Sequence, residues 1–191
     1  YIFDLSGNQL GIITTTDAID FEYFGTSVAI GKTAGDNKIV IGKIDDSPNT
    51  PPSTTVPNAG SAYIYDLDGS FEAKIYASNL SANDRFGSEP GSIAIGHGRI
   101  VVGAPNANSG QGNAYIFDLS GNQLGIITAS DSSTTADDFG RRVAIGNEKI
   151  VIGDYGNDPG GGANANALNA AGAAYIYDLD GSNEIKITAS D

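Results

Sequence analysis

The chain has 191 residues and a net charge of −13, with 26 glycines and 40% apolar residues. This composition is typical of a turn-rich globular β protein rather than a disordered chain. The negative charge repels phosphate backbones and anionic lipid, so it argues against nucleic-acid binding and membrane insertion. Neutral glycans, proteins or divalent cations are better partners, although acidity also serves simply to keep a β protein soluble. The absence of cysteine excludes disulfides and thiolate sites.

The chain opens with YIFDLSGNQLGIIT (residues 1–14), and the same fourteen letters return at residues 115–128. The sequence has no methionine, and no signal peptide or membrane-spanning run is visible in it. We therefore expect a processed product or a piece of a longer polypeptide.

Three phrases recur in a fixed order along the chain. A Phe-Gly pair precedes a short apolar run, a run such as KIVIG follows, and a run such as AYIYDL comes third. The first phrase begins at Phe24, Phe86 and Phe139, the second at Lys38, Arg99 and Lys149, and the third at Ala62, Ala114 and Ala174. Such internal repetition predicts an array of similar units.

Each unit contains four strand signals, which are clearest in the last copy. Residues 142–146 and 149–153 form one predicted hairpin, and residues 174–180 and 184–190 form a second. KIVIG is apolar on consecutive residues and AYIYDL on both faces, which predicts strands covered on both sides. EIKITAS alternates, with Ile185 and Ile187 on one face, which predicts an edge strand with one wet face.

These patterns predict an all-β fold built from four-stranded antiparallel sheets. Sheets of this kind stacked face to face around an axis form a β-propeller. A two-sheet sandwich is the main alternative, but it would expose one face of every sheet, and the inner strands alternate too little for that.

Phe-Gly ahead of an apolar strand, followed by Gly103-Ala104-Pro105 after the next strand, resembles the FG-GAP repeat of integrin-α-type β-propellers. The resemblance covers essentially the whole chain, although the GAP element has drifted to Gly42-Lys43-Ile44 and Gly153-Asp154-Tyr155 in the other copies. The phrasing is also similar to repeats in predicted proteins of marine phages and bacteria. The resemblance implies a propeller in an extracellular or virion setting.

The strand order predicts a single propeller arc of about three and a half blades over residues 1–191. It has a half blade at 1–23 and blades at 24–78, 86–130 and 139–190. The half blade supplies strands three and four, so the ring cannot close with these residues alone. Either the polypeptide continues beyond these ends, which we favour, or several chains assemble into a homo-oligomer.

Binding residues concentrate on loops held by a rigid scaffold, so the long loops at one rim of the blades are the candidate recognition face. The loops between strands two and three cover residues 43–61, 105–113 and 154–173. The loops between strand four and the next strand one carry acids, and the candidate ligand-binding residues are Asp17, Asp20, Asp84, Asp131, Asp137 and Asp138. Solvated spacers without a partner are the alternative interpretation.

We expect no required cofactor and assign no metal ligand. The resemblance implies a calcium cage between strands one and two, but those loops here are too poor in acids to supply six oxygen ligands. A calcium ion shared among the acids of the candidate rim stays an open alternative. DLDGS at Asp66 and Asp178 is explained by an Asp-Gly hairpin turn.

No catalytic residue is assigned, and we expect no enzyme. His97 is the only histidine and lies in a predicted turn, so no Ser-His-Asp arrangement is available. We expect a structural and recognition module, such as a phage tail, fibre or decoration component that contacts a host surface or other virion proteins. The alternative is a secreted or cell-surface bacterial adhesion protein, assisted by calcium, with a protein or glycan ligand.

Overall fold

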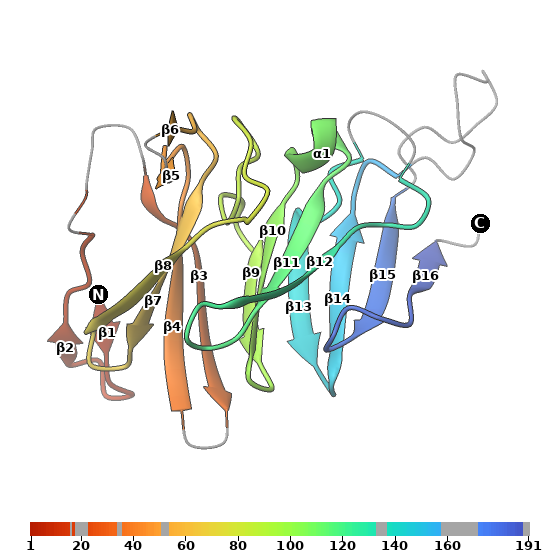
Figure 1. Cartoon of the computed structure of the whole chain (residues 1–191). Coiled ribbons are helices and arrows are strands. Elements are labelled where there is room, and N and C mark those ends of the chain that lie inside the picture. The colour runs from red at the N-terminus through yellow and green to blue at the C-terminus, as the bar shows by residue number, and fades with distance from the viewer. Residues whose placement is uncertain are drawn as a thin grey trace.

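The computed structural model of the chain describes residues 1–15, 17, 23–33, 36–50, 54–132, 137–157 and 172–188. It contains three four-stranded antiparallel sheets, which we call blades 1, 2 and 3, and a two-stranded sheet, which we call the N-terminal hairpin. Figure 1 shows the hairpin and the blades in a row in chain order, with the N-terminal hairpin at one end and blade 3 at the other.

Each blade is a meander in which every strand pairs with its neighbours in sequence. The N-terminal hairpin consists of β1 (Ile2–Phe3) and β2 (Gln9–Gly11). Blade 1 consists of β3 (Phe24–Thr33), β4 (Asp36–Lys43), β7 (Ser61–Asp66) and β8 (Phe71–Ile75). Blade 2 consists of β9 (Ile93–Gly96), β10 (Arg99–Ala104), β11 (Asn113–Phe117) and β12 (Gln123–Ile127). Blade 3 consists of β13 (Arg142–Gly146), β14 (Lys149–Asp154), β15 (Ala173–Asp178) and β16 (Ile185–Thr188).

The second and third strands of blade 2 show why consecutive apolar residues suit this fold. Val101 pairs with Ile116 and Val102 pairs with Tyr115, so adjacent residues point to opposite faces of the sheet. All of these side chains are buried, because blade 1 covers one face and blade 3 covers the other. The prediction that both faces of the inner strands are covered is therefore correct for this blade.

The Phe-Gly segments are wedged between neighbouring blades. Phe86 and Phe139 are fully buried, and each packs in a cluster with residues of the preceding blade. Glycine permits the backbones to meet, since a Cβ built on Gly103 of blade 2 would lie 1.7 Å from the carbonyl oxygen of Gly140 at the start of blade 3. The Phe-Gly pair thus sets the closest approach of one blade to the next.

The outer face of blade 3 differs from the sequence-based expectation for its edge strand. Ile185 and Ile187 of β16 are 56% and 50% exposed, whereas Lys186 between them is partly buried. The alternation is present, but the face that carries the isoleucines is the one exposed to solvent. The reason is that this face corresponds to the one covered by the following blade in blades 1 and 2, and no further blade lies there among the described residues.

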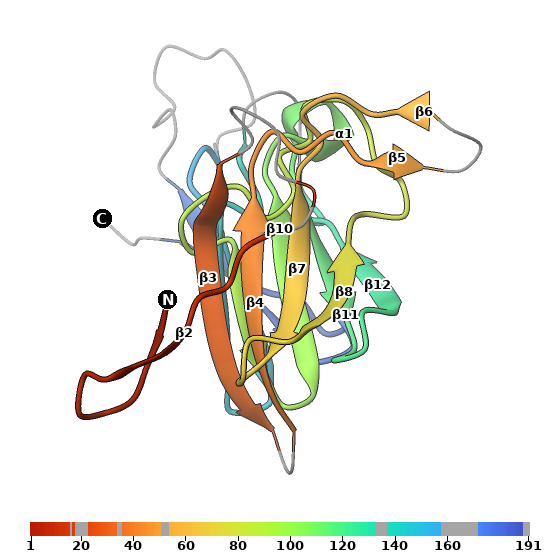
Figure 2. The same cartoon turned by 90° about the vertical axis from the view of Figure 1, so that its left-hand side faces the viewer.

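The connections divide between two rims, as an antiparallel meander requires. Tight turns such as Asn147–Glu148 join strands one and two at one rim, and longer loops gather at the other (Figures 1 and 2). The long loops contain a small two-stranded sheet of β5 (Asn49–Thr50) and β6 (Thr54–Thr55) and one helical turn, α1 (Ala107–Gly110). We call this edge the loop rim.

The structure confirms an all-β fold of four-stranded antiparallel blades packed as in a β-propeller, and the described residues form an arc rather than a closed ring. Within the described part of the chain, no helix is long and apolar enough to span a membrane.

Candidate functional site

An aspartate clasp joins each of two loop segments to the next blade at the loop rim. Asp17, which follows the N-terminal hairpin, accepts a hydrogen bond from the hydroxyl of Tyr63 in blade 1, with its two carboxylate oxygens 2.7 and 2.8 Å away. Asp131, which follows blade 2, accepts one at 2.5 Å from the hydroxyl of Tyr175 in blade 3. Both tyrosine side chains are buried, so these bonds anchor the loops to the sheets.

The clasp at blade 1 belongs to a neutralised cluster of charges. Lys43 is fully buried, and its ammonium lies 3.3 Å from a carboxylate oxygen of Asp17 and 3.4 Å from one of Asp46. Lys74 lies 2.7 Å from the other oxygen of each carboxylate. Two lysines therefore balance two aspartates, which is the condition under which buried charges are tolerated.

The electrostatics at blade 1 favour the charged forms of these groups. Burial by itself would raise the pKa of Asp17, but hydrogen bonds from Lys74, Thr15 and Tyr63 outweigh burial and hold the pKa well below its usual value. Burial would lower the pKa of Lys74, but Asp17 and Asp46 raise it above its usual value. The cluster is thus a set of ion pairs at neutral pH.

The clasp at blade 3 has the same layout with one charge reversed and one charge removed. Asp154 takes the position of Lys43 and Asn157 that of Asp46, while Lys186 contacts both Asp131 and Asn157. Asp154 is fully buried, and its Oδ1 has no hydrogen-bond partner among the described residues. Burial and the charge of Asp137 raise the pKa of Asp154 to about 7.

The acids predicted as ligand-binding residues are therefore distributed over separate blade junctions. Asp17 lies at blade 1, whereas Asp131 and Asp137 lie near Asp154 of blade 3. Asp84 is buried before blade 2, where it accepts the backbone N–H of Ser81 at 2.7 Å, and burial raises its pKa. Asp138 forms an ion pair at 2.8 Å with Arg141. Asp20 lies outside the described residues.

These acids do not combine into a metal site in the part of the chain that the structure describes, where no group of three or more His, Asp or Glu side chains is arranged to hold an ion. Asp17 and Asp131 instead hold loops to blades, whereas the side chains of Asp84 and Asp138 contact residues three positions away in the chain. Lys43, Asp46 and Asp154 were missed from the sequence. The signal that marks Lys43 and Asp154 is the repeat position of Ala104, where the other two copies carry a charge, and Asp46 lies three residues after Lys43.

The most exposed aromatic contact on the loop rim lies between blades 2 and 3. Tyr155, which follows β14, is 66% exposed, and the guanidinium of Arg141 lies 5.2 Å from its ring centroid. Arg141 also lies 3.8 Å from Glu89 and is held by Asp138. An exposed tyrosine fixed by a cation and flanked by acids offers stacking and hydrogen bonding at one place. We call Tyr155, Arg141, Asp138 and Glu89 the rim patch.

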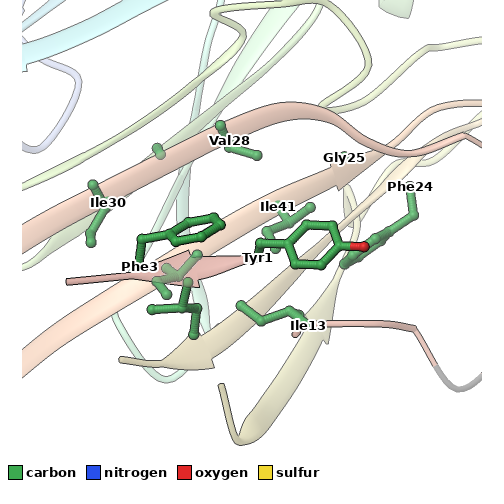
Figure 3. A pocket seen from close by; sticks show the side chains of 11 residues that line it. Tyr1, Phe3, Ile13, Phe24, Gly25, Val28, Ile30 and Ile41 are labelled. Atoms are coloured by element: carbon green, nitrogen blue, oxygen red, sulfur yellow. The ribbon is translucent and has the colours of Figure 1, made fainter. Parts of the chain in front are cut away.

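A second candidate surface is an apolar groove of about 470 Å³ between the N-terminal hairpin and blade 1. Figure 3 shows Tyr1 and Phe3 on one side, Val28 and Ile30 of β3 on the other, and Ile41 and Phe24 in the same view. Val28 and Ile30 are 67% and 70% exposed. We call this the N-terminal groove.

Comparison with known proteins gives one family match. The FG-GAP repeat matches residues 8–65, 70–117 and 122–177. Each matched segment begins just before the last strand of one sheet and ends in the third strand of the next blade. No curated protein matches the chain.

Proposed function

Because this chain belongs to the FG-GAP repeat family, we propose that it is a non-enzymatic structural and recognition module. FG-GAP repeats are typically extracellular and typically non-enzymatic. Within that setting the proposed role is that of a virion component, such as a phage tail, fibre or decoration protein. It would contact a host surface or other virion proteins through its loop rim.

The observation that carries this proposal is the rim patch. Tyr155 is exposed on a loop between two rigid blades, and Arg141, Asp138 and Glu89 fix the chemistry around it. Tyrosine and arginine are the residues that most often anchor recognition surfaces, because they combine apolar area with directional polar groups. This arrangement suits a protein surface or a neutral glycan, and the net charge of −13 disfavours polyanions.

The predicted acids contribute to this function through the scaffold. Asp17 and Asp131 each bind a buried tyrosine and a lysine, so their carboxylates hold loops in place instead of pointing freely toward a ligand. A loop segment that is already held in place loses less conformational entropy when a ligand binds. The proposal therefore places the contact at the rim patch, in which Asp138 is the residue retained from the predicted acids.

The alternative proposal is a secreted or cell-surface adhesion protein of a bacterium, with calcium as an assisting ion. It would use the same rim, and it differs in where the protein works and in whether calcium strengthens binding. A binding experiment with calcium and with a chelator separates the calcium-assisted form from the other.

The proposal is tested by measuring how the fluorescently labelled 191-residue chain binds to an array of neutral and acidic glycans and to intact bacterial cells. Two variants are compared with the parent chain. Tyr155→Ser removes the stacking surface and should weaken binding about tenfold or more. His97→Ala changes an exposed residue in the turn between β9 and β10, on the opposite rim, and should leave binding unchanged. Equal loss in both variants, or turnover of a glycan, would contradict the proposal.

A further inference from the structure

The junction between blades 1 and 2 is neutral at the repeat positions where at least one of the other two junctions carries a charge. Asn79 is a hydrogen-bond partner of Tyr115, at the position where the other junctions have an aspartate. Ala104 and Ala107 are buried in one cluster with that tyrosine, where the other junctions have charged or amide side chains. The charges of the clasp are thus exchanged together for neutral groups.

The same exchange continues onto the outermost strand of blade 2, where it leaves two apolar side chains exposed. The clasp tyrosines of blades 1, 2 and 3 pair with Lys74, Ile126 and Lys186 of the fourth strands. Two residues earlier, the chain carries Glu72, Leu124 and Glu184. In blade 2, a leucine and an isoleucine therefore replace the acid and the lysine of the other blades, and they are still 51% and 43% exposed.

These two side chains lie on β12, which is an edge strand. It pairs with β11 on one side, and no strand lies on its other side among the described residues. In Figure 2, β12 and β8 lie on the side of the blades opposite to β3. The start of β12 is held by Gln123, whose side chain accepts a hydrogen bond from the backbone of Ser78 at 2.9 Å and donates one to its hydroxyl at 3.0 Å. An ordered and neutral edge of this kind is a template for an added strand.

The corresponding edges of blades 1 and 3 are protected by charges. Glu72 lies 2.7 Å from the ammonium of Lys38, and Lys74 lies 2.7 Å from Asp17. In blade 3, Lys186 is bound to an aspartate in the same way. A strand added beside β8 or β16 would remove these ion pairs from water, which is costly, whereas a strand beside β12 would cover only apolar and amide groups.

The sequence of β12 is complementary to itself in antiparallel pairing. When Gly125 lies opposite Gly125 of a second copy, Leu124 lies opposite Ile126 of that copy, and Ile126 lies opposite its Leu124. The four side chains then share one face of the joined sheet. The contact closes on itself through a two-fold axis, so it ends at a dimer.

The charge of the chain favours this strand over the rest of the surface as a contact between copies. Two chains with a net charge of −13 repel each other. The segment Gln123–Ile127 contains no ionisable side chain, so neither copy brings a charge to the contact. The apolar side chains supply the attraction that the repulsion opposes.

We propose that β12 is a dimer surface, on which a second copy of this chain adds its own β12 as an antiparallel strand about a two-fold axis at Gly125. The two four-stranded blades then form one continuous sheet. Leu124 and Ile126 of the two copies cover each other. Because the contact is one strand wide, the dimer is weak and forms at high protein concentration.

Sedimentation equilibrium of the 191-residue chain over a wide range of concentrations measures the dimer. The double variant Leu124→Glu/Ile126→Lys gives β12 the residue types that β8 and β16 have at these positions, so blade 2 is expected to fold. It should raise the dimer dissociation constant about tenfold or more. Ile187→Lys changes a half-exposed residue of the edge strand β16 and should alter the constant less than about twofold.

A cysteine on the proposed two-fold axis tests the register. The chain has no cysteine, and a Cβ built on Gly125 meets no atom closer than 3.9 Å, so Gly125→Cys introduces a single thiol at little cost. Opposite residues of antiparallel strands have Cα atoms about 4.5–5.5 Å apart, which suits a disulfide. Gly125→Cys should form a covalent dimer on mild oxidation. Ile185→Cys, at the equivalent and 56% exposed position of β16, reports linking by chance collision and should react about tenfold more slowly.

Three results would overturn the proposal. The first is a chain that stays monomeric at every concentration, with amide exchange in β12 that does not slow as the concentration rises. The second is a dimer whose dissociation constant is unchanged in the double variant. The third is covalent dimer formation at equal rates from Gly125→Cys and Ile185→Cys, because β12 would then have no preferred contact.

Discussion

Blades 2 and 3 have the same strand order and equivalent residues, yet their second and fourth strands lie in different environments. Val101 of blade 2 is fully buried, whereas its counterpart Val151 of blade 3 is 37% exposed. Ile127 is 3% exposed and its counterpart Ile187 is 50% exposed. Since the residue types match, the repeat specifies a position in an interface, and the neighbouring blade decides whether that position contributes buried apolar area.

The two blades also differ in the polarity of the loop rim. Blade 2 has Ala104 and Ala107 beside Tyr115, both buried, where blade 3 has Asp154 and Asn157 beside Tyr175. An alanine needs no partner, but a buried aspartate needs either a cation or a proton. The same fold therefore tolerates an apolar junction and a charged junction. The stability of the charged junction depends more strongly on pH.

The largest effect is expected from a methyl group placed between blades 2 and 3. Gly103→Ala should lower the free energy of unfolding by about 4 kcal/mol or more, because the Cβ would lie 1.7 Å from the backbone oxygen of Gly140. Gly153→Ala is the matched control in blade 3, where the nearest atom would be 3.5 Å away, and it should change stability by less than about 1 kcal/mol. Denaturant unfolding measures both. Equal effects would contradict the difference between the covered and the open face.

A smaller difference is expected for apolar truncation in the fourth strands. Ile127→Ala should cost about 2–5 kcal/mol, because it opens a cavity in the cluster between blades 2 and 3. Ile187→Ala removes a half-exposed side chain and should cost less than about 1 kcal/mol. Thermal unfolding of the two variants against the parent chain tests this, and a large loss for Ile187→Ala would mean that the outer face of blade 3 is covered in solution.

Asp154 should make the stability of the chain depend on pH. Its folded pKa of about 7 lies above the unfolded value of 3.8, so the folded state binds more protons between these two pH values. Stability from this group therefore falls as the pH rises from about 4 to about 7, by up to about 4 kcal/mol. Asp154→Asn should remove this slope and unfold at a higher denaturant concentration than the parent at pH 8. An unchanged pH profile would contradict the pKa assignment.

The smallest effect concerns the clasp hydroxyls. Tyr175→Phe removes a hydrogen bond to the carboxylate of Asp131 and should cost about 1.5–3 kcal/mol. Tyr115→Phe removes bonds to the neutral side chains of Asn113 and Asn79 and should cost about 1 kcal/mol. Denaturant midpoints at pH 7 give the ranking, and a greater loss for Tyr115→Phe would contradict the assigned clasp.

The repeated phrases were sufficient to predict the all-β fold and the four-stranded antiparallel sheets. Consecutive apolar residues predict strands that are covered on both faces, and phrases such as KIVIG and AYIYDL carry that signal. The solvent-exposed face of β16 was predicted wrongly at Ile185 and Ile187. Exposure there depends on a neighbouring sheet, which the pattern of one strand does not encode.

The loop rim was harder to predict than the sheets. The described aspartates of the predicted set lie on loops, but a single sequence does not show that Asp17 and Asp131 reach the hydroxyls of Tyr63 and Tyr175, which are more than forty residues away in the chain. Comparison of Lys43, Ala104 and Asp154 at one repeat position would have indicated the charged junctions. Tyr155 is not marked by any repeat, so its exposure and its contact with Arg141 could be found only in three dimensions.

The family match is offset by one strand from the sheets, and this offset has a consequence for the association of the blades. Each matched segment contributes its first strand to one sheet and three strands to the following blade. The polypeptide therefore crosses every boundary between neighbouring sheets. If two blades part at their apolar face, the connecting segment still tethers them, so their reassociation is an intramolecular event at high effective concentration.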